Sequence, residues 1–464
     1  MAPPNVLWIF VDQLRYHALS CHGEVNVRTP NIDRLAAEGV TFDNAVSSCP
    51  VCTPARAAVL TGQYCSTTGV LYLGDLLVPQ RRTVAHAFGE AGYRTSYVGK
   101  WHLASAQNPE GHNEGAEYWV HPLLRGGFQD WFGFELSNHY WRTRYSTGES
   151  MWPPHELPGY QTDGLTDLSL AYLRDVASKG DAPWFHVLSL ETPHHGSDAD
   201  GVARVQVGER FHTRHPAPAE YEARFDPGAI VLRPNVPEEY HEVAASQQAQ
   251  YCAMIANLDD NVGRLFDWLE STGAHENTLV AFFSDHGELG GSHRRFQKCS
   301  AYAESLLVPL IMRLPGAIPA GRRVARPANL VDLFPTCASL CGVSTGSDVQ
   351  GCDLTPGIVG DDDAIRREGS LSQWFGNPRY HPEGLPGEQW RAIHTDRYTY
   401  AVYEYGRVEL FDNRDDPYQM ENRGADASYA EVRGRLHGLL CTEIVGAGEP
   451  VPAFVNAASG SDYE

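Results

Sequence analysis

The stretch from Ser48 to Gly62 holds the residues whose types and spacing are best suited to chemistry. Cys52 precedes Pro54, which suits the first turn of a helix, and Gly62 suits the end of that helix. We therefore expect Cys52 at or just before a helix N-terminus, where free N–H groups and the helix dipole favour an anion. Arg56 lies one turn further on and brings a bidentate hydrogen-bond donor to the same place.

Cys52 has three competing interpretations. It could be a buried structural cysteine, which is the ordinary role of a single cysteine in a core. It could form a redox pair with Cys49, because the two are spaced C-x-x-C, although the surroundings do not indicate a thioredoxin-like unit. The third interpretation comes from a resemblance to a known family, which this stretch and motifs further along the chain carry together.

Four apolar runs predict buried strands, and each is followed by residues that could act on a substrate. They are Val6–Val11 before Asp12 and Gln13, Arg94–Val98 before Lys100 and His102, Trp184–Leu190 before His194, and Leu279–Phe283 before Asp285 and His286. In a doubly wound parallel sheet the carboxyl ends of the strands converge on one crevice. The pattern therefore predicts a single polar site.

Several motifs carry a resemblance to one family. Cys52-Thr-Pro-Ala-Arg56 with Leu60-Thr-Gly62 resembles the C-x-P-x-R…L-T-G signature of the type I sulfatases, in the alkaline phosphatase superfamily. Gly99-Lys-Trp-His102 and Pro193-His194 match further positions of that pattern. So do the run from Lys298 to Thr336 and the segment Asp416–Asn422, so that the resemblance extends from Asn5 to about Asn422.

The resemblance implies a role for each residue of the predicted site. Cys52 would be oxidised to formylglycine (3-oxoalanine), whose hydrated aldehyde, a gem-diol, is the nucleophile of the family. Arg56 would orient this nucleophile, and His102 would steady it and act as a base. Lys100 and Lys298 would bind the sulfate oxygens, while His194 would protonate the leaving oxygen, with its neighbour His195 the competing assignment.

The same resemblance implies a divalent metal ion that polarises the oxygens of the ester. Its predicted ligands are Asp12, Gln13, residue 52, Asp285 and His286. Many sulfatases have Asp where this chain has Gln13 and Asn where it has His286. With these departures the site has fewer anionic oxygen ligands, and one imidazole, compared with a cage of carboxylates. We expect Ca²⁺ as the bound ion, with Mn²⁺ or Mg²⁺ as alternatives.

The sequence thus predicts a sulfuric ester hydrolase that releases an alcohol and inorganic sulfate from an aryl, alkyl or carbohydrate sulfate. The alternative within the superfamily is a phosphonate monoester or phosphodiester hydrolase, because the pairs Asp12-Gln13 and Asp285-His286 resemble those enzymes. Lys100 and His102 favour sulfate. A catalytically dead binding protein of the same fold is a further alternative, against which the intact set of polar residues argues.

Composition limits the partners that we expect. The 464 residues carry 36 Lys and Arg against 58 Asp and Glu, a formal net charge of −22, which argues against nucleic acid and anionic membranes as partners. The ten cysteines have no dense spacing, and the N-terminus lacks the pattern of a signal peptide, so we expect free thiols and a cytoplasmic location. The expected partners are the sulfate ester and a formylglycine-generating enzyme. A homo-oligomer is compatible with the sequence.

The order of the predicted elements defines the fold class. Alternating strands and helices predict an α/β fold with a large, mixed, mostly parallel sheet between layers of helices, which is alkaline-phosphatase-like. We assign residues 1–350 to this catalytic domain. Residues 365–464 are expected to form a small antiparallel sheet with a helix and a tail. The aromatic-rich stretch 104–162 has little periodicity and is expected to be loop, with one or two rings available as a substrate wall.

Overall fold

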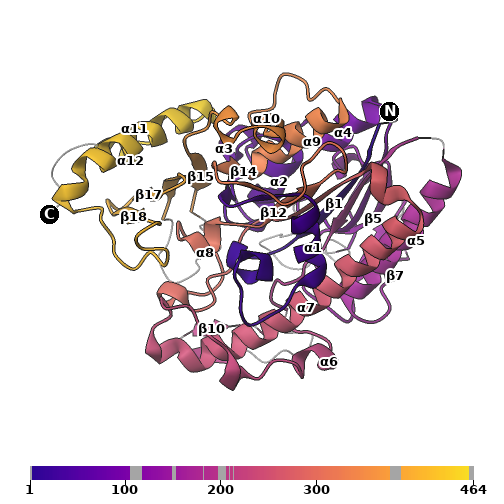
Figure 1. Cartoon of the computed structure of the whole chain (residues 1–464), viewed down its shortest axis with the longest axis horizontal. Coiled ribbons are helices and arrows are strands. Elements are labelled where there is room, and N and C mark those ends of the chain that lie inside the picture. Colours follow the sequence, from indigo (N-terminus) through magenta and orange to yellow (C-terminus); the bar gives the residue numbers. More distant parts are fainter. Residues whose placement is uncertain are drawn as a thin grey trace.

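The alternating elements fold around one ten-stranded sheet in the computed structural model of this chain (Figure 1). The structure describes residues 3–104, 118–148, 153–180, 182–196, 205–207, 210–212, 214–376 and 388–458. In spatial order the strands are β13 (Arg322–Val324), β2 (Val40–Phe42), β12 (Leu310–Arg313), β11 (Thr278–Ser284), β1 (Asn5–Val11), β8 (Trp184–Ser189), β4 (Arg94–Lys100), β5 (Asp130–Phe134), β6 (Arg144–Thr147) and β7 (His155–Glu156).

The pairing pattern confirms the expected mixed, mostly parallel sheet. The central pairings from β11 through β1, β8 and β4 to β5 are all parallel. Antiparallel pairings occur towards the edges, where β12 joins β11 and β2, and where β6 joins β5 and β7. Because the central strands are parallel, the segments that follow β1, β4, β8 and β11 all leave the same edge of the sheet.

Helices cover both faces of the sheet, which explains why the strands are apolar throughout. Along β1, Trp8 packs into one core cluster and Ile9 into the other. The helices of the first cluster are α2 (Cys52–Thr61), α4 (Val84–Glu90), α9 (Leu333–Cys341) and α10 (Thr355–Val359). Those of the second are α1 (Pro30–Glu38), α5 (Gln161–Lys179) and α7 (His241–Ser271), and Figure 1 shows the two groups on opposite sides of β1.

The stretch 104–162 corrects our expectation of loop. Residues 105–117 and 149–152 lie outside the described residues, but β5, β6 and β7 extend the main sheet. These strands are short and are separated by turns, and β5 pairs with β4 outside the stretch, so local periodicity did not reveal them. Trp131 of β5 packs with Tyr97 and Trp101 inside the first core cluster, which makes it a core residue and not a substrate wall.

A second sheet follows in the C-terminal part of the chain, as expected. Its strands are β15 (Ser370–Trp374), β16 (Trp390–His394), β17 (Tyr398–Tyr403) and β18 (Val408–Asp412), all antiparallel, with α11 (Ala430–Gly446) and α12 (Ala453–Ala457) beside them. One core cluster joins this unit to the first: Trp390 and Leu440 pack with Val51. The backbone N–H of Gln373 also donates to the carbonyl of Ser48 over 2.8 Å.

The remaining elements are short. They are β3 (Ala45–Val46) with β14 (Ala328–Asn329), β9 (Val205–Val207) with β10 (Arg210–His212), α3 (Cys65–Thr68), α6 (Ala219–Glu222) and α8 (Ala303–Leu306).

Within the described ranges, none of the helices has both the length and the apolar character needed to cross a bilayer. All ten cysteines fall in the described part of the chain, and each is a free thiol, as expected.

Candidate active site

Cys52 is the first residue of α2, as the Pro54 and Gly62 signals predict. Gly62 ends the helix in the left-handed conformation with φ 66°. The Cys52 side chain is buried, and its Sγ lies 3.2 Å from His286 Nε2, 3.3 Å from Lys298 Nζ and 3.6 Å from Asp12 Oδ1. Three residues that are distant in sequence therefore converge on the sulfur at a helix N-terminus.

Cys49 does not share this environment. It packs in the cluster that joins the two sheets, where its thiol lies beside that of Cys65. Burial, followed by the Cys65 thiol, raises the pKa of Cys49 well above its usual value, so it stays protonated. A thiol of this kind is a poor partner for redox exchange.

Asp12 and Asp285 meet because β1 and β11 run in parallel register. Val11 pairs with Ser284, so the next residue on each strand reaches the same point at the sheet edge. His286 Nε2 lies 3.6 Å from an oxygen of each carboxylate. Its Nδ1 is 3.1 Å from the carbonyl of Gly287, which places the ring proton on Nδ1 and leaves the Nε2 lone pair facing the carboxylates.

This arrangement fits a divalent cation. One atom each from Asp12, Cys52, Asp285 and His286 lies within 4.8 Å of all the others. The two oxygens of Asp12 have separate surroundings: Oδ2 is engaged by Arg56 and Lys100, at 3.0 Å and 2.8 Å, whereas Oδ1 faces Cys52 and His286. One oxygen of Asp12 is thus available as a ligand.

Arg56 and Lys100 lie buried on the other side of Asp12. Arg56 contacts Asp285 through Nε at 3.2 Å and donates to Ser189 Oγ at 2.9 Å and to the Lys100 carbonyl at 3.0 Å. The guanidinium therefore fixes both carboxylates through its several donors. Burial, the largest single influence, acts to lower the pKa of Lys100, but Asp12, residue 52 and Glu191 together outweigh it and raise that pKa above its usual value.

Lys298 reaches the site from a loop after β11. Its Nζ lies 2.9 Å from the side-chain oxygen of Gln13, whose amide nitrogen donates to Glu288. Gln13 has φ 66°, a left-handed conformation at the end of β1 that turns its backbone N–H onto Asp285, 3.1 Å away. The predicted ligand Gln13 is therefore present at the site, with its side-chain oxygen next to Lys298.

Burial alone would raise the pKa of Asp12, but Lys100, His194, Arg56 and Lys298 together hold it well below its usual value. Burial and then the Asp12 charge raise the pKa of the Cys52 thiol to about 11, although Lys298 and Lys100 act against the rise. As a thiol, Cys52 is therefore protonated near neutral pH and a weak nucleophile.

His102 lies close to the same charges. Its backbone has φ 60°, and its ring is buried with no hydrogen-bond partner at either nitrogen among the described residues. Burial, followed by the Lys100 charge, holds its pKa well below the usual value. A buried ring without partners is costly, so the side chain is suited to contact a group that enters the site.

His194 and His195 are neighbours with different surroundings. His194 Nδ1 lies 2.8 Å from the carbonyl of His195, and the hydroxyl of Tyr140 donates to the His194 carbonyl over 2.6 Å. Burial and then the Lys298 charge hold the pKa of His194 well below its usual value. The His195 ring lies against the His194 ring at a tilt of 38°, with ring centroids 4.1 Å apart, and is partly exposed.

Sequence reasoning missed three residues that hold the site together. Ser189 bridges Arg56 and the Lys100 carbonyl, Glu191 lies 3.5 Å from Lys100 Nζ, and Glu288 accepts from Gln13. Glu191 and Glu288 follow β8 and β11 in the sequence, close to His194 and His286. Their position after a strand was the available signal, as it was for Asp12.

Comparison with known proteins gives consistent matches over almost the whole chain. The Sulfatase family model matches residues 4–343, and the model of the N-sulphoglucosamine sulphohydrolase C-terminal region matches residues 291–445. An ulvan-active sulfatase from Formosa agariphila is 34% identical over 453 residues, spanning 96% of this chain and 82% of that protein.

Solved structures share the fold. A putative sulfatase, yidJ, from Bacteroides fragilis has a TM-score of 0.82 at 26% identity and covers 98% of this chain and 97% of its own. A phosphonate monoester hydrolase from Agrobacterium radiobacter has a TM-score of 0.73 at 25% identity, with 96% of both chains covered.

Proposed function

We propose a substrate and a nucleophile on the premise that this chain belongs to the sulfatase family of the alkaline phosphatase superfamily and is a sulfuric ester hydrolase. The substrate is a sulfated saccharide, and the nucleophile is a formylglycine formed from Cys52. The observation that carries the proposal is the position of Cys52 at the start of α2, within 3.6 Å of Asp12, His286 and Lys298. The C-terminal match to a sulfated amino-sugar hydrolase and the ulvan-active relative support a saccharide.

The high pKa of the Cys52 thiol also supports its conversion to formylglycine. Its pKa of about 11 leaves little thiolate near neutral pH, so Cys52 as it stands lacks activation. Hydrated formylglycine at this position would supply an oxygen nucleophile, and a divalent cation would supply positive charge to the sulfate oxygens. A formylglycine-generating enzyme is the partner that this maturation requires.

Asp12, Asp285, His286 and Gln13 would hold the cation, together with residue 52. Oxygen donors predominate in this set, which favours Ca²⁺, and the imidazole keeps Mn²⁺ and Mg²⁺ as alternatives. Arg56 would keep both carboxylates in place through its contacts with Asp12 and Asp285.

The remaining residues would act on the ester itself. Lys100 and Lys298 would bind the sulfate oxygens, and His102 would contact residue 52 as a base. His194 would hold a proton at Nε2 for the leaving oxygen. Its low pKa comes from burial and from Lys298, and an anionic ester placed against Lys298 would offset that repulsion and favour protonation.

The experiment uses protein from the native host, or protein produced together with a formylglycine-generating enzyme. 4-Nitrophenyl sulfate, a set of sulfated saccharides and a phenylphosphonate monoester are compared by kcat/KM. We expect the saccharides to exceed the phosphonate. A higher kcat/KM for the phosphonate would instead favour the alternative that the Agrobacterium structure and the pairs Asp12-Gln13 and Asp285-His286 suggest.

Metal dependence is tested on the same preparation. Chelation should abolish activity and lower the unfolding temperature, because the carboxylates of Asp12 and Asp285 lose their shared counter-charge. Ca²⁺, Mn²⁺ and Mg²⁺ are then added back separately, and both readouts are recorded. Full activity in a metal-free preparation would contradict the proposed site.

We also propose that the protein works in a reducing compartment, for which ten free cysteines are the supporting observation. Fractionation of the native host, followed by detection of the protein in the cytoplasm or outside it, is the test.

A further inference from the structure

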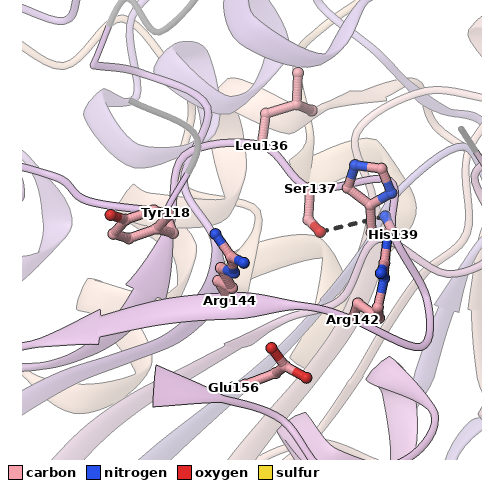
Figure 2. A pocket seen from close by; sticks show the side chains of 7 residues that line it. All are labelled: Tyr118, Leu136, Ser137, His139, Arg142, Arg144 and Glu156. Atoms are coloured by element: carbon pink, nitrogen blue, oxygen red, sulfur yellow. Dashed lines mark hydrogen bonds between the residues drawn. The ribbon is translucent and has the colours of Figure 1, made fainter. Parts of the chain in front are cut away.

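A polar pocket of about 400 Å³ opens beside the active site (Figure 2). Its walls are Tyr118, the loop that follows β5, and the strands β6 and β7. Two arginines line it, Arg142 and Arg144, and Figure 2 shows His139 beside Arg142, with Arg144 across from them. The backbone N–H of His139 donates to Ser137 Oγ over 3.2 Å. The only acidic residue among its described lining residues is Glu156.

The charge of this pocket contrasts with that of the molecule. The chain has a formal net charge of −22, and many of its arginines are engaged in ion pairs. Within the described part of the chain, neither Arg142 nor Arg144 has an ion-pair partner. Glu156 pairs with Arg144 in the β6–β7 register, yet their side chains form no ion pair. Two uncompensated guanidinium groups in one pocket are suited to an oxyanion.

The pocket is connected to the catalytic residues by direct contacts. The backbone N–H groups of Ser137 and Asn138 donate to the carboxylate of Glu191, at 3.1 Å and 2.8 Å. Glu191 in turn lies 3.5 Å from Lys100 Nζ. The loop begins after Phe134, which pairs with Lys100 in the parallel register of β4 and β5. The pocket therefore borders the edge of the sheet where the ester would react.

We propose that Arg142 and Arg144 form a subsite for a second anionic group of the saccharide, a carboxylate or another sulfate, next to the ester that reacts at residue 52. The inference rests on the proposed function and narrows its substrate class to acidic saccharides. Glu156 limits the strength of the subsite because it lies beside Arg144. The arginines are specificity residues, since they would contact a part of the substrate that does not react.

The test compares four substrates on active enzyme. They are a sulfated disaccharide with a neighbouring uronate, its carboxyl-reduced form, a disulfated disaccharide without a carboxylate, and 4-nitrophenyl sulfate, which is too small to need the pocket. The variants are Arg142→Gln, Arg144→Gln, the double variant and Glu156→Gln. Arg435→Gln is the matched control, an exposed arginine on α11, at the opposite end of Figure 1 from β7.

We expect each arginine variant to raise KM for the preferred acidic substrate roughly tenfold, and to leave 4-nitrophenyl sulfate unchanged. Glu156→Gln should lower that KM, a gain that a structural role would not produce. The uronate and disulfated substrates show which oxyanion is bound. Two results would overturn the subsite. The first is that the unsubstituted enzyme has the same kcat/KM for the uronate, the carboxyl-reduced and the disulfated substrates. The second is that the arginine variants lose equal activity on all four substrates. If 4-nitrophenyl sulfate and every saccharide sulfate were inert, the proposed function would fail as well.

Discussion

Asp12 divides its two oxygens between two tasks. Oδ2 is held by Arg56 and Lys100, whereas Oδ1 faces Cys52 and His286. This division lets one carboxylate anchor the buried cations and still offer an oxygen to a metal ion. Such an arrangement helps a buried site to keep several charges, because Asp12, Asp285, Arg56 and Lys100 each have a partner of opposite sign.

His194 gives a prediction that separates it from its neighbour. If His194 protonates the leaving oxygen, His194→Gln should lower kcat by roughly 100-fold or more for a saccharide sulfate, whose alcohol is a poor leaving group. The loss should be much smaller for 4-nitrophenyl sulfate, whose phenolate leaves without help. His195→Gln is the matched control. Equal losses on both substrates in His194→Gln would exclude the acid role, and a leaving-group-dependent loss in His195→Gln would transfer that role to His195.

At the scale of elements, the convergence of the site was predictable because parallel strands present their carboxyl ends together. Asp12, Lys100, His194 and Asp285 were placed correctly at one sheet edge from the apolar runs before them. The strand order and the antiparallel edges were not predictable, since they depend on long-range pairing. The pocket of Arg142 and Arg144 was not predicted either, because its walls include β6 and β7, two short strands in the stretch 104–162 that we expected to be loop.

The C-terminal sheet supports the catalytic loops. The indole N–H of Trp390 donates to the carbonyl of Cys299 over 3.1 Å, next to Lys298. The N–H of Gln373 likewise donates to the carbonyl of Ser48, four residues before Cys52. The predicted units 1–350 and 365–464 therefore share a core, and the second contacts the loops that carry Cys52 and Lys298.

Trp390→Phe tests this support. It keeps most of the packing and leaves the Cys299 carbonyl without this donor, which should destabilise the protein by about 1–3 kcal/mol. Because Cys299 is adjacent to Lys298, KM for the sulfate ester should rise as well. Urea unfolding and steady-state kinetics are the measurements, with Trp374→Phe on the neighbouring strand as control. A stability loss with unchanged KM would show that the sheet does not position Lys298.

At the scale of the whole molecule, buried neutral histidines make stability depend on pH. His186 lies between Ser96 and Ser169, and burial lowers its pKa to about 3. Burial likewise lowers the pKa of His394 to about 4. Because the unfolded chain takes up these protons near pH 6.5 and the folded chain does not, stability is full above that pH and falls as the pH drops towards the folded pKa values.

The expected size of this effect is about 2 kcal/mol for each such histidine at pH 5 relative to pH 7. Urea unfolding at pH 7, 6 and 5 should show the decline, with the steepest part below pH 6.5. The variant His186→Gln should have a flatter profile, because it lacks one of the groups that titrate only after unfolding. A free energy of unfolding that stays constant from pH 7 to pH 5 would contradict the prediction that His186 and His394 stay neutral in the folded protein.

The most direct test of the account is the mass of the peptide that contains Cys52, taken from protein of the native host. Conversion of the cysteine to formylglycine lowers the residue mass by about 18 Da, because an aldehyde replaces the thiol carbon. We predict that loss at Cys52 alone, with the mass of Cys49 unchanged. An unmodified thiol at Cys52 in active native protein would contradict the formylglycine mechanism.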